Sequence, residues 1–429
     1  MNFTNHKIGI WGTGIVGISA LHFFKKEGAV LAVYDNKPLT TTAQAFCQQY
    51  NVRVYTPENL DLFLTECDYI LPSAGINLKH YHSYKHKFLS EVDIFFSRYK
   101  NPIIAVTGTI GKTTVTQSLH TMLTHYGYRP QLGGNIGIGL FDLLEDQANY
   151  NYAVLELSSF QLESVEFFSP TIAIWTNLYP NHLDRHGTMH DYFLAKLPII
   201  KNQTADNYAL LHESVKPYLH MLNFKSSLHF FGNELPEALR GISELKTYSE
   251  HYRILYEVAC LLRLDIKQLP TILERIESPE HRVTLIAQIN GVDFYDDSKS
   301  TIPQATHGAL TRFPERPIIL FFGGVSKGVS RESFFKKLPA NLKHIYLFGA
   351  EADILKNYCP LTLSHSEHAT LQEAFQACIQ KMAPGDVVLF SPGGASFDLF
   401  KDYKERGRTF QELAKQCSLT HQNFAHHLK

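Results

Sequence analysis

Short apolar runs that end in glycine-rich loops constrain the fold of this chain more than any other feature. Four such runs are Lys7–Trp11, Ile103–Val106, Ile318–Phe322 and Val387–Phe390. Helical periodicity follows the first two loops, over Ile15–Lys26 and from Thr113 to about Tyr126. A strand, a glycine turn and a helix in succession begin a βαβ unit, which builds a parallel sheet with helices on its faces. The sequence therefore predicts an α/β fold.

The length of the chain, 429 residues, predicts several domains, because one hydrophobic core stops growing at about 250–300 residues. Further strands are predicted over Ala29–Tyr34, Tyr69–Leu71, Ala153–Leu157, Thr171–Thr176, Tyr208–Leu211, Val292–Tyr295 and His344–Phe348. Further helices are predicted over Tyr252–Leu264, Leu371–Met382 and Tyr403–Gln416. A linker at Arg98–Pro102 and a boundary at Ser278-Pro279 divide this pattern. We expect a Rossmann-like domain over residues 1–98, a P-loop-type central domain over 99–278 and a Rossmann-like C-terminal domain over 279–429.

Composition excludes several classes of function. The formal net charge is -1, which argues against a nucleic-acid-binding protein that works by bulk charge. No apolar run approaches the length of a membrane span, and the N-terminus lacks a signal-peptide cleavage site. The six cysteines are scattered, as is typical of free thiols in a reducing compartment. We therefore expect a soluble, cytoplasmic, monomeric protein that binds neither nucleic acid nor membranes.

The loop Val106–Thr114 reads V-T-G-T-I-G-K-T-T and is typical of a phosphate-binding loop between a strand and a helix. Its glycines allow backbone N–H groups to turn toward phosphate oxygens at the N-terminus of the helix. Lys112 would neutralise charge on the terminal phosphates, and Thr113 would offer a hydroxyl to Mg²⁺. Valine at position 106 departs from the general G-x-x-x-x-G-K-[ST] spacing. The alternative is a chance glycine turn.

A second glycine loop, Gly12–Gly17, also lies between a strand and a helix, and Asp35 ends the next strand. The pattern fits a dinucleotide-dependent oxidoreductase. It fits equally well a protein that binds another nucleotide diphosphate without hydride transfer. A third interpretation is structural, since glycines also permit close packing of a helix on a strand.

Several other polar groups follow predicted strands, at the edge where α/β sheets bind ligands. Glu156 ends a strand beside the phosphate loop and is well placed to hold Mg²⁺. His182 is a lone histidine, and such residues more often lie on the surface or in the core than at a metal. Three further loops of this kind are Asp296–Thr301, Gly323–Gly328 and Ser391–Asp398. Their lysines and glycines suit anionic groups, although each loop could be a simple turn.

Together these segments resemble the Mur ligase family over nearly the whole chain, in the same order. Features shared across that family are Gly108–Thr114, Glu156, Asn177–His182 and Lys196. Features similar to its D-glutamate-adding branch are Gly133–Gly137, Leu155–Glu163 and Leu389–Arg408. The resemblance implies that the first domain binds a uridine diphosphate. It therefore argues against a dinucleotide-dependent oxidoreductase that uses nicotinamide.

The resemblance implies an ATP-dependent amide ligase that joins D-glutamate to UDP-N-acetylmuramoyl-L-alanine in a cytoplasmic step of peptidoglycan synthesis. The substrate carboxylate would attack the γ-phosphate of ATP, and the amine of D-glutamate would then displace phosphate from the acyl phosphate. Two Mg²⁺ ions and a CO₂-derived carbamate on Lys196 are also implied. The third domain would close over the reactants and exclude water.

The resemblance also implies roles for individual residues. Those expected to bind the UDP precursor are Gly14, Ile15, Asp35, Asn36, Lys37, Asn135 and Ser158. Those expected to bind ATP are Gly108, Thr109, Gly111, Lys112, Thr113, Thr114, Arg282, Asp297 and Lys299. Those expected to bind D-glutamate are Thr301, Lys327, Ser396, Phe397 and Tyr403. The expected metal ligands are Thr113, Glu156, His182 and Lys196, and the expected catalytic residues are Lys112, His182, Lys196 and Lys299.

The chain departs from the family pattern at Asn181, at the helix start near His251 and in the segment before that helix, which is short. Asn181 stands where an aspartate usually precedes the histidine. The family helix start His-Asn-x-x-Asn reads His251–Leu255 here, so both asparagines and an expected adenine contact are lost. We expect these changes to affect ATP affinity and nucleotide preference.

Three rival functions remain open. One is another ligase of the same family that adds L-alanine, a diamino acid or polyglutamate, although Ser391–Arg408 favours D-glutamate. Another is a noncatalytic UDP-sugar-binding or regulatory protein, and the third is a phosphotransferase or simple ATPase. The joint presence of the four residues Lys112, Glu156, His182 and Lys196 favours catalysis over the noncatalytic function.

Overall fold

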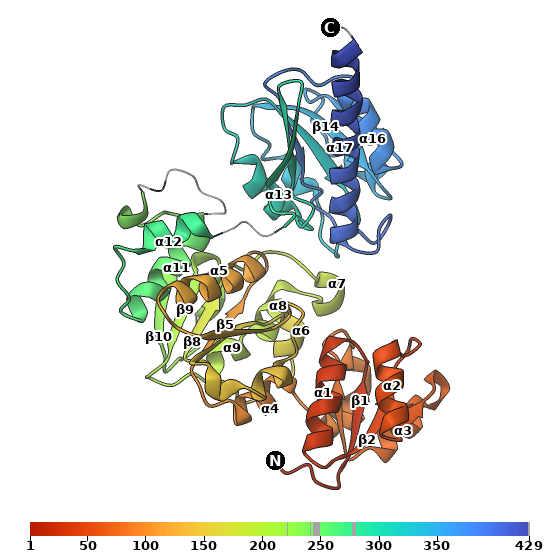
Figure 1. Ribbon diagram of the computed structural model, residues 1–429, viewed down its shortest axis with the longest axis vertical. Coiled ribbons are helices and arrows are strands. Elements are labelled where there is room, and N and C mark those ends of the chain that lie inside the picture. Colours follow the sequence, from red (N-terminus) through yellow and green to blue (C-terminus); the bar gives the residue numbers. More distant parts are fainter. Residues whose placement is uncertain (221, 241, 243–248, 277–279, 428–429) are drawn as a thin grey trace. The chain divides into compact units, whose positions relative to one another are not determined.

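The computed structural model describes residues 1–220, 222–240, 242, 249–276 and 280–427. Within these residues the strands form three β-sheets, one of four strands and two of six. Helices accompany each sheet, and the labels in Figure 1 follow the chain from its N-terminal to its C-terminal end. The predicted α/β fold is confirmed. The expected boundary at Ser278-Pro279 lies outside the described residues.

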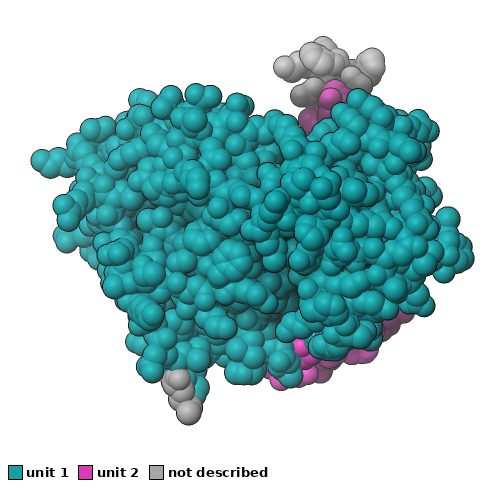
Figure 2. All heavy atoms as spheres, turned by 90° about the horizontal axis from the view of Figure 1, so that it is seen from below, with its two compact units in different colours: residues 1–178, 188–245, 249–276 teal, residues 179–187, 246–248, 277–429 magenta. Residues whose placement is uncertain are grey.

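The chain forms two compact units, which Figure 2 distinguishes by colour. The first unit comprises the described residues of 1–178, 188–245 and 249–276, and it holds the first two sheets. The second unit comprises the described residues of 179–187 and 277–429, and it holds the third sheet. Each sheet takes its strands from one of the three expected domain ranges. The exact domain boundaries stay a prediction.

The first sheet is parallel, in the order β3-β2-β1-β4. Its strands are β1 (Lys7–Trp11), β2 (Val30–Tyr34), β3 (Arg53–Tyr55) and β4 (Tyr69–Pro72), and its helices are α1 (Ile15–Lys26), α2 (Thr41–Gln49) and α3 (Leu60–Glu66). The predicted limits of β1 and α1 are confirmed to the residue, whereas the sequence pattern does not predict β3, α2 or α3. Because β1 lies between β2 and β4, the carboxyl ends of these strands flank a switch point where α/β sheets bind ligands.

Helix α4 (Glu91–Arg98) follows the first sheet, and two of its buried acids bind the central part of the first unit. The carboxylate of Asp93 accepts the backbone N–H groups of residues 166–168 at 2.7–3.2 Å. Glu91 accepts the N–H of Leu140 at 3.1 Å. Burial raises the pKa of Glu91 to about 7, although hydrogen bonds from Leu140 and Gln161 oppose the shift.

The central sheet has six parallel strands in the order β10-β9-β8-β5-β7-β6. They are β5 (Ile103–Thr107), β6 (Pro130–Gly134), β7 (Tyr152–Glu156), β8 (Ile172–Trp175), β9 (Tyr208–His212) and β10 (Ser227–Phe231). The principal helices are α5 (Lys112–His125), α11 (Ser249–Leu261) and α12 (Leu269–Arg275), and the short ones are α6 (Ser159–Leu162), α7 (Leu183–His186), α8 (Met189–Lys196), α9 (Pro198–Lys201) and α10 (Lys216–Leu219). Helix α11 was predicted over Tyr252–Leu264. Its first and last residues each lie three positions earlier than predicted. Arg263, with φ +55, takes a left-handed conformation just beyond the end of α11.

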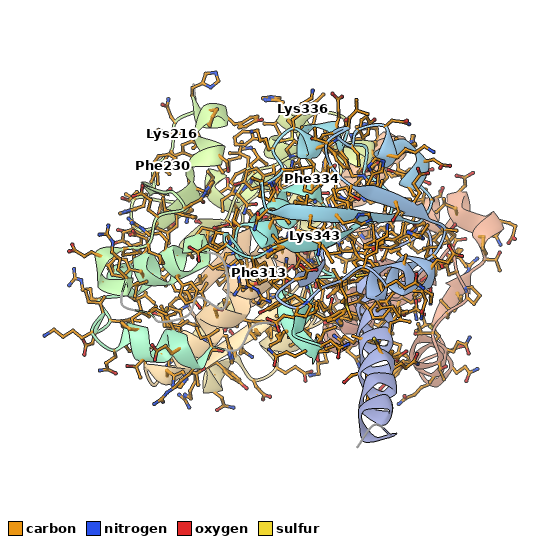
Figure 3. All side chains as sticks on the ribbon, turned by 90° about the horizontal axis from the view of Figure 1, so that it is seen from above. Lys216, Phe230, Phe313, Phe334, Lys336 and Lys343 are labelled. Atoms are coloured by element: carbon orange, nitrogen blue, oxygen red, sulfur yellow. The ribbon has the colours of Figure 1, made fainter. Side chains whose placement is uncertain are left out.

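The third sheet has the order β11-β12-β16-β13-β14-β15, and only the β11–β12 pair is antiparallel. Its strands are β11 (Thr284–Ile289), β12 (Val292–Asp296), β13 (Ile318–Gly323), β14 (Leu342–Phe348), β15 (His365–His368) and β16 (Val387–Phe390). Its helices are α13 (Pro303–Leu310), α14 (Glu332–Phe335), α15 (Ala352–Lys356), α16 (Leu371–Ile379) and α17 (Tyr403–His427). Two hydrophobic cores form around this sheet, and Phe313 and Phe334, labelled in Figure 3, belong to one of them.

Among the described residues, no helix combines the length and the apolar character that a membrane span requires. The six cysteines are free.

Substitution of the buried acid Glu91 with glutamine tests how α4 is held. Between pH 4.5 and about 7 the folded state keeps a proton that the unfolded chain releases, so stability falls as pH rises through this window. Glu91→Gln mimics the protonated acid, so we expect it to raise the free energy of unfolding at pH 8 by about 1–3 kcal/mol. The gain should largely vanish at pH 4.5.

Thermal unfolding at both pH values measures this difference. The exposed Glu315→Gln variant is the matched control and should show no pH-dependent gain. Equal effects of Glu91→Gln at pH 4.5 and pH 8 would show that Glu91 carries no extra proton in the folded state.

Candidate active site

The carboxyl edge of the central sheet gathers most of the polar groups predicted for its domain. The phosphate loop follows β5, Asn135 follows β6, Glu156 ends β7, and Thr176-Asn177 follows β8. These strands are parallel and adjacent in the sheet, so their carboxyl ends lie along one edge. Parallel pairing thereby collects residues that lie far apart in the sequence, from Gly108 to Asn177.

Two glycines of the phosphate loop adopt conformations that exclude a side chain. Gly108 has φ +146, and a Cβ there would lie 2.0 Å from the Thr176 hydroxyl. Gly111 has φ +86, and a Cβ there would lie 2.3 Å from Nε2 of His251. The close approach of these neighbours and the positive φ angles both require glycine.

Asn177 and Thr176 hold the middle of the phosphate loop. The backbone N–H of Ile110 donates to the Asn177 side chain at 2.9 Å, and the N–H of Thr109 donates to the Asn177 carbonyl at 3.0 Å. The Thr176 hydroxyl donates to the Ile110 carbonyl at 2.6 Å. Lys112 folds back over the loop and donates to the carbonyls of Gly108 and Thr109, both at 3.0 Å. The loop is therefore fixed by its own neighbours.

Glu156 is buried, with 2% of its surface exposed. Its Oε1 atom accepts a hydrogen bond from the Asn135 amide at 2.9 Å. Its Oε2 atom is buried and has no hydrogen-bond partner among the described residues. A buried carboxylate oxygen in this state is a position for a ligand such as a metal ion, because Mg²⁺ prefers oxygen donors. The residues present therefore fit a divalent cation at Glu156.

Lys196 is fully buried on α8. Its ammonium donates to the Thr107 hydroxyl at 3.2 Å and lies 4.9 Å from the centre of the Tyr192 ring. Burial lowers the pKa of Lys196 well below its ordinary value, and the charge of Lys112 lowers it further, while the charge of Glu156 opposes both. This environment favours the uncharged amine, which is a nucleophile.

His182 has a left-handed backbone with φ +54 at the start of α7. The side-chain oxygen of Asn181 accepts the N–H of His182 at 3.1 Å, so the residue that departs from the family pattern supports this turn. Residues 179–187 group with the second unit, whereas Glu156 and Lys196 lie in the first. The metal-binding role of His182 therefore stays a prediction. No cluster of three His, Cys, Asp or Glu side chains suited to a metal ion occurs in the described part of the chain.

The residues predicted for the UDP precursor lie at the carboxyl edge of the first sheet. Asp35 accepts the N–H and the hydroxyl of Thr13, both at 2.7 Å, and the N–H of Lys37 at 3.0 Å. Burial alone would raise the pKa of Asp35, but these hydrogen bonds and the Lys37 charge lower it on balance. Gly14 and Ile15 are exposed at the start of α1. The edge therefore presents an ionised carboxylate beside an open helix N-terminus.

Two further predicted contacts for the precursor come from the central sheet. A Cβ added to Gly137 would lie 4.0 Å from the Ile15 side chain, so the loop that begins at Asn135 adjoins α1 within the first unit. Ser158 caps α6 by accepting the N–H of Gln161 at 3.2 Å. Asn36 and Lys37 are exposed beyond β2.

The third sheet brings the predicted D-glutamate residues to its carboxyl edge. Lys327 donates to the Thr301 hydroxyl at 3.4 Å. Lys299 donates to the Tyr403 hydroxyl at 3.1 Å and lies 4.8 Å from the centre of that ring. Ser396 is buried, whereas Phe397 is 73% exposed. Lys327, predicted for D-glutamate, and Lys299, predicted for ATP, give this edge a positive charge that suits anionic ligands.

Asp297 and Arg282 carry unsatisfied buried atoms in the second unit. Oδ2 of Asp297 accepts the hydroxyls of Ser300 at 2.5 Å and Ser391 at 2.6 Å. Within the described residues, Oδ1 of Asp297 and both Nε and Nη1 of Arg282 have no hydrogen-bond partner. Burial raises the pKa of Asp297 to about 6, against the opposing hydroxyl bonds and the Arg282 charge. These atoms remain available to a polar ligand.

Comparison with known proteins supplies the family. Residues 106–259 match the Mur ligase middle domain, and residues 281–394 match the Mur ligase, glutamate ligase domain. UDP-N-acetylmuramoylalanine–D-glutamate ligase of Caldicellulosiruptor saccharolyticus is 31% identical over 97% of this chain and 100% of that protein. The protein of the same name from a Geobacter species is 31% identical over 97% of this chain and 98% of its own length.

The chain belongs to the Mur ligase family. The MurF ligase of Thermotoga maritima, solved in complex with ADP, has a similar structure with a TM-score of 0.59. The similarity covers 97% of this chain and 96% of that one at 15% identity, and it shows the shared fold. The expectation of a three-domain Mur ligase fold is confirmed.

The departure from the family helix start has a structural counterpart. Tyr252 and Leu255 are buried in the core that also holds Leu119 and Met122 of α5. Both side chains therefore pack against α5, the helix that follows the phosphate loop. His251 keeps the family residue and lies against Gly111. The effect on nucleotide preference stays a prediction.

Several residues that shape this Mur ligase site received no role from the sequence, although Thr107 lies in the loop Val106–Thr114 and Arg406 in the segment Leu389–Arg408. Thr107 contacts Lys196, and the buried Arg331 and Arg406 donate to backbone carbonyls of the loops after β13 and β16. An arginine within a polar segment is usually exposed, so the sequence offers no signal for its burial.

Gly111→Ala tests the conformation of the phosphate loop. The variant adds both backbone strain and a collision with His251, so we expect it to lower the free energy of unfolding by about 1–3 kcal/mol. Thermal unfolding measures the loss. The second substitution His251→Ala should recover part of it, since only the collision is relieved.

Gly127→Ala is a matched control for backbone strain. Gly127 has φ +84, but nothing lies within 4 Å of an added Cβ. The stability lost by Gly111→Ala should therefore exceed that lost by Gly127→Ala. Equal losses, with no recovery on adding His251→Ala, would contradict the close contact at the loop.

Proposed function

We propose that this chain is an ATP-dependent, ADP-forming ligase that joins D-glutamate to UDP-N-acetylmuramoyl-L-alanine in peptidoglycan synthesis. The observation that carries the proposal is a buried Glu156 oxygen beside a glycine-lysine phosphate loop. This oxygen has no hydrogen-bond partner within the described part of the chain. Such a pair suits phosphoryl transfer, in which a metal-bound nucleotide gives up its γ-phosphate. Full-length similarity to ligases of this name supports the choice of substrates. The enzyme is proposed to work as a cytoplasmic monomer.

Each sheet is proposed to serve one substrate. The first edge, with Asp35 and the open start of α1, suits the uridine diphosphate. The central edge, with Lys112, suits the phosphates of ATP, and Arg282 and Asp297 of the second unit would also contact the nucleotide. The third edge, with Lys327 and Thr301, suits the carboxylates of D-glutamate. The ligand positions all follow carboxyl ends of parallel strands.

The proposed reaction activates an unreactive carboxylate before the amide bond forms. A carboxylate is a weak acylating agent, so its oxygen first attacks the γ-phosphorus of ATP, and the bond to ADP breaks. The amine of D-glutamate then attacks the acyl carbon, loses a proton and expels phosphate. Lys112 and Lys299 offset the repulsion between the anions that must approach one another. Exclusion of water protects the acyl phosphate from hydrolysis.

Glu156, with Thr113 and His182, is proposed to hold Mg²⁺. The metal, when bound, would neutralise charge on the phosphate oxygens. Two ions are proposed. The uncharged amine favoured at Lys196 can attack CO₂ and lose a proton, which gives a carbamate. This modification would replace a cation with an anionic oxygen ligand beside Glu156.

Phosphate release from ATP tests the proposed reaction. We expect release to require both UDP-N-acetylmuramoyl-L-alanine and D-glutamate, while L-glutamate, glycine and L-alanine fail. Lys112→Ala should lower kcat by about 100-fold or more, because charge on the transferred phosphate is left unbalanced. Release with L-alanine or a diamino acid in place of D-glutamate would assign the chain to another reaction of the family.

Two other outcomes would identify the remaining rivals. Binding of the UDP precursor without phosphate release under any condition would indicate a noncatalytic binding protein. Release that needs no amino acid at all would indicate a simple ATPase.

Removal of CO₂ tests the proposed role of Lys196. In CO₂-free buffer we expect kcat to fall by about 10- to 100-fold, the usual loss when a metal site loses an oriented ligand. Bicarbonate should restore activity slowly, and intact-protein mass spectrometry under mild conditions should detect one added CO₂. Lys196→Arg, which keeps a cation but cannot form the carbamate, should be inactive in both buffers. Full activity of the unmodified protein would exclude the carbamate.

A further inference from the structure

We propose that the ion pair of Arg331 and Glu351 positions the loop that carries Lys327 and thereby sets the affinity for the amino-acid substrate. The inference rests on the proposed function, because Lys327 is assigned to D-glutamate there. Both members of the pair lie outside the motifs that define the family resemblance. Arg331 and Glu351 are positioning residues, since they act on the substrate through Lys327.

Arg331 holds the backbone at the end of β13 and the start of the loop that follows it. It is 3% exposed, and its guanidinium donates to the carbonyls of Gly323 at 2.9 Å and Gly324 at 2.8 Å. It also lies 5.5 Å from the centre of the Phe322 ring. A single side chain therefore fixes the direction of two successive peptide groups where β13 ends.

Glu351 connects Arg331 to the next part of the same loop. Its Oε2 atom accepts a hydrogen bond from Arg331, and its Oε1 atom accepts the backbone N–H of Ser326 at 2.7 Å. Ser326 immediately precedes Lys327. One carboxylate thus joins the arginine that holds the start of the loop to the peptide that carries the lysine.

The far side of the loop is held by the loop that follows β16. Val325 and Ala395 exchange backbone hydrogen bonds at 2.9 and 2.8 Å, which places the loop beside Ser396. A Cβ on Gly324 would lie 2.2 Å from the Ala395 carbonyl, so the two loops are in direct contact. The Lys327 ammonium then reaches Thr301. Gly328 packs against the backbone of Asp184 on the other side of Lys327. Loss of the ion pair would remove the support at Ser326, which neither the loop after β16 nor Asp184 supplies.

The energetics favour a positioning role over a purely stabilising one. The Arg331 side chain is buried and that of Glu351 is partly exposed. Desolvation of the arginine offsets much of the Coulomb attraction, so such a pair adds little net stability compared with apolar residues. Its directional hydrogen bonds nevertheless define geometry, and displacement of a binding group by about 1 Å can cost up to 100-fold in rate. An arginine is suited to this task because its planar fork binds a carboxylate and two carbonyls together.

The pair Arg316–Asp293 provides a matched control in the same unit. Arg316 also donates to a carboxylate, Asp293 at 2.5 Å, and to the backbone carbonyls of Gly385 and Asp386. Asp293 lies near the amino end of β12, away from the ligand-binding edge of the sheet. Removal of either pair disturbs a similar set of bonds, but only one pair adjoins Lys327.

Steady-state kinetics of Glu351→Gln, Arg331→Lys and the control Arg316→Lys test the proposal. Glu351→Gln keeps the size of the side chain and an acceptor for Ser326, so it tests the ion pair with little change in volume. We expect KM for D-glutamate to rise about 10- to 100-fold in the first two variants. KM for ATP and for the UDP precursor should change less than about twofold, and Arg316→Lys should leave all three values unchanged.

The outcomes separate this inference from the proposed function. A wild-type enzyme that needs no D-glutamate would overturn the proposed reaction itself. An active wild type with unchanged KM for D-glutamate in Glu351→Gln would overturn the positioning role. A parallel loss for all three substrates in both variants would mean that the pair only stabilises the fold. Glu351→Asp keeps the charge, so it should recover part of the affinity for D-glutamate that Glu351→Gln loses. This comparison tests the ion pair even if Arg331→Lys does not fold.

Discussion

Parallel pairing of β5 with its two neighbours is the constraint on which the candidate site depends. The register sets Val106 beside Glu156 of β7 and Thr107 beside Trp175 of β8. Three adjacent strands therefore bring the phosphate loop, the carboxylate of Glu156 and the side chain of Asn177 to one edge of the sheet. Thr107 then reaches Lys196. A slip of one residue in either pair would turn these side chains to the opposite face of the sheet.

The central part of each sheet could be predicted from the sequence, and the edges mostly could not. The strands without a sequence signal are β3, β6, β10, β11 and β15. Each of them is the edge strand of its sheet. An edge strand is paired on one side only and is less buried, so its apolar pattern is weak. β15, with the sequence His-Ser-Glu-His, shows this most clearly.

The candidate site divides in a similar way. Glycine loops with lysine could be predicted, because backbone conformation and phosphate chemistry leave a local pattern in the sequence. Arg331 and Glu351 could not, since they are 20 residues apart and meet only when β13 and β14 pair. The low pKa of Lys196 could not be predicted either, because it arises from tertiary burial beside Lys112. The sequence therefore predicts the loops that carry the reactive groups. It does not predict the tertiary contacts that hold those groups in place.

Complete burial of Lys196 has a consequence for time scales. An amine without exposed surface meets small molecules from solution only when the surrounding structure opens locally, and such openings are rare in a packed core. A chemical state that the amine acquires during one opening should then persist until the next. Two preparations of the same chain, made under different atmospheres, would behave as distinct populations that interconvert slowly. The activity of a preparation would then depend on the conditions in which the protein had folded.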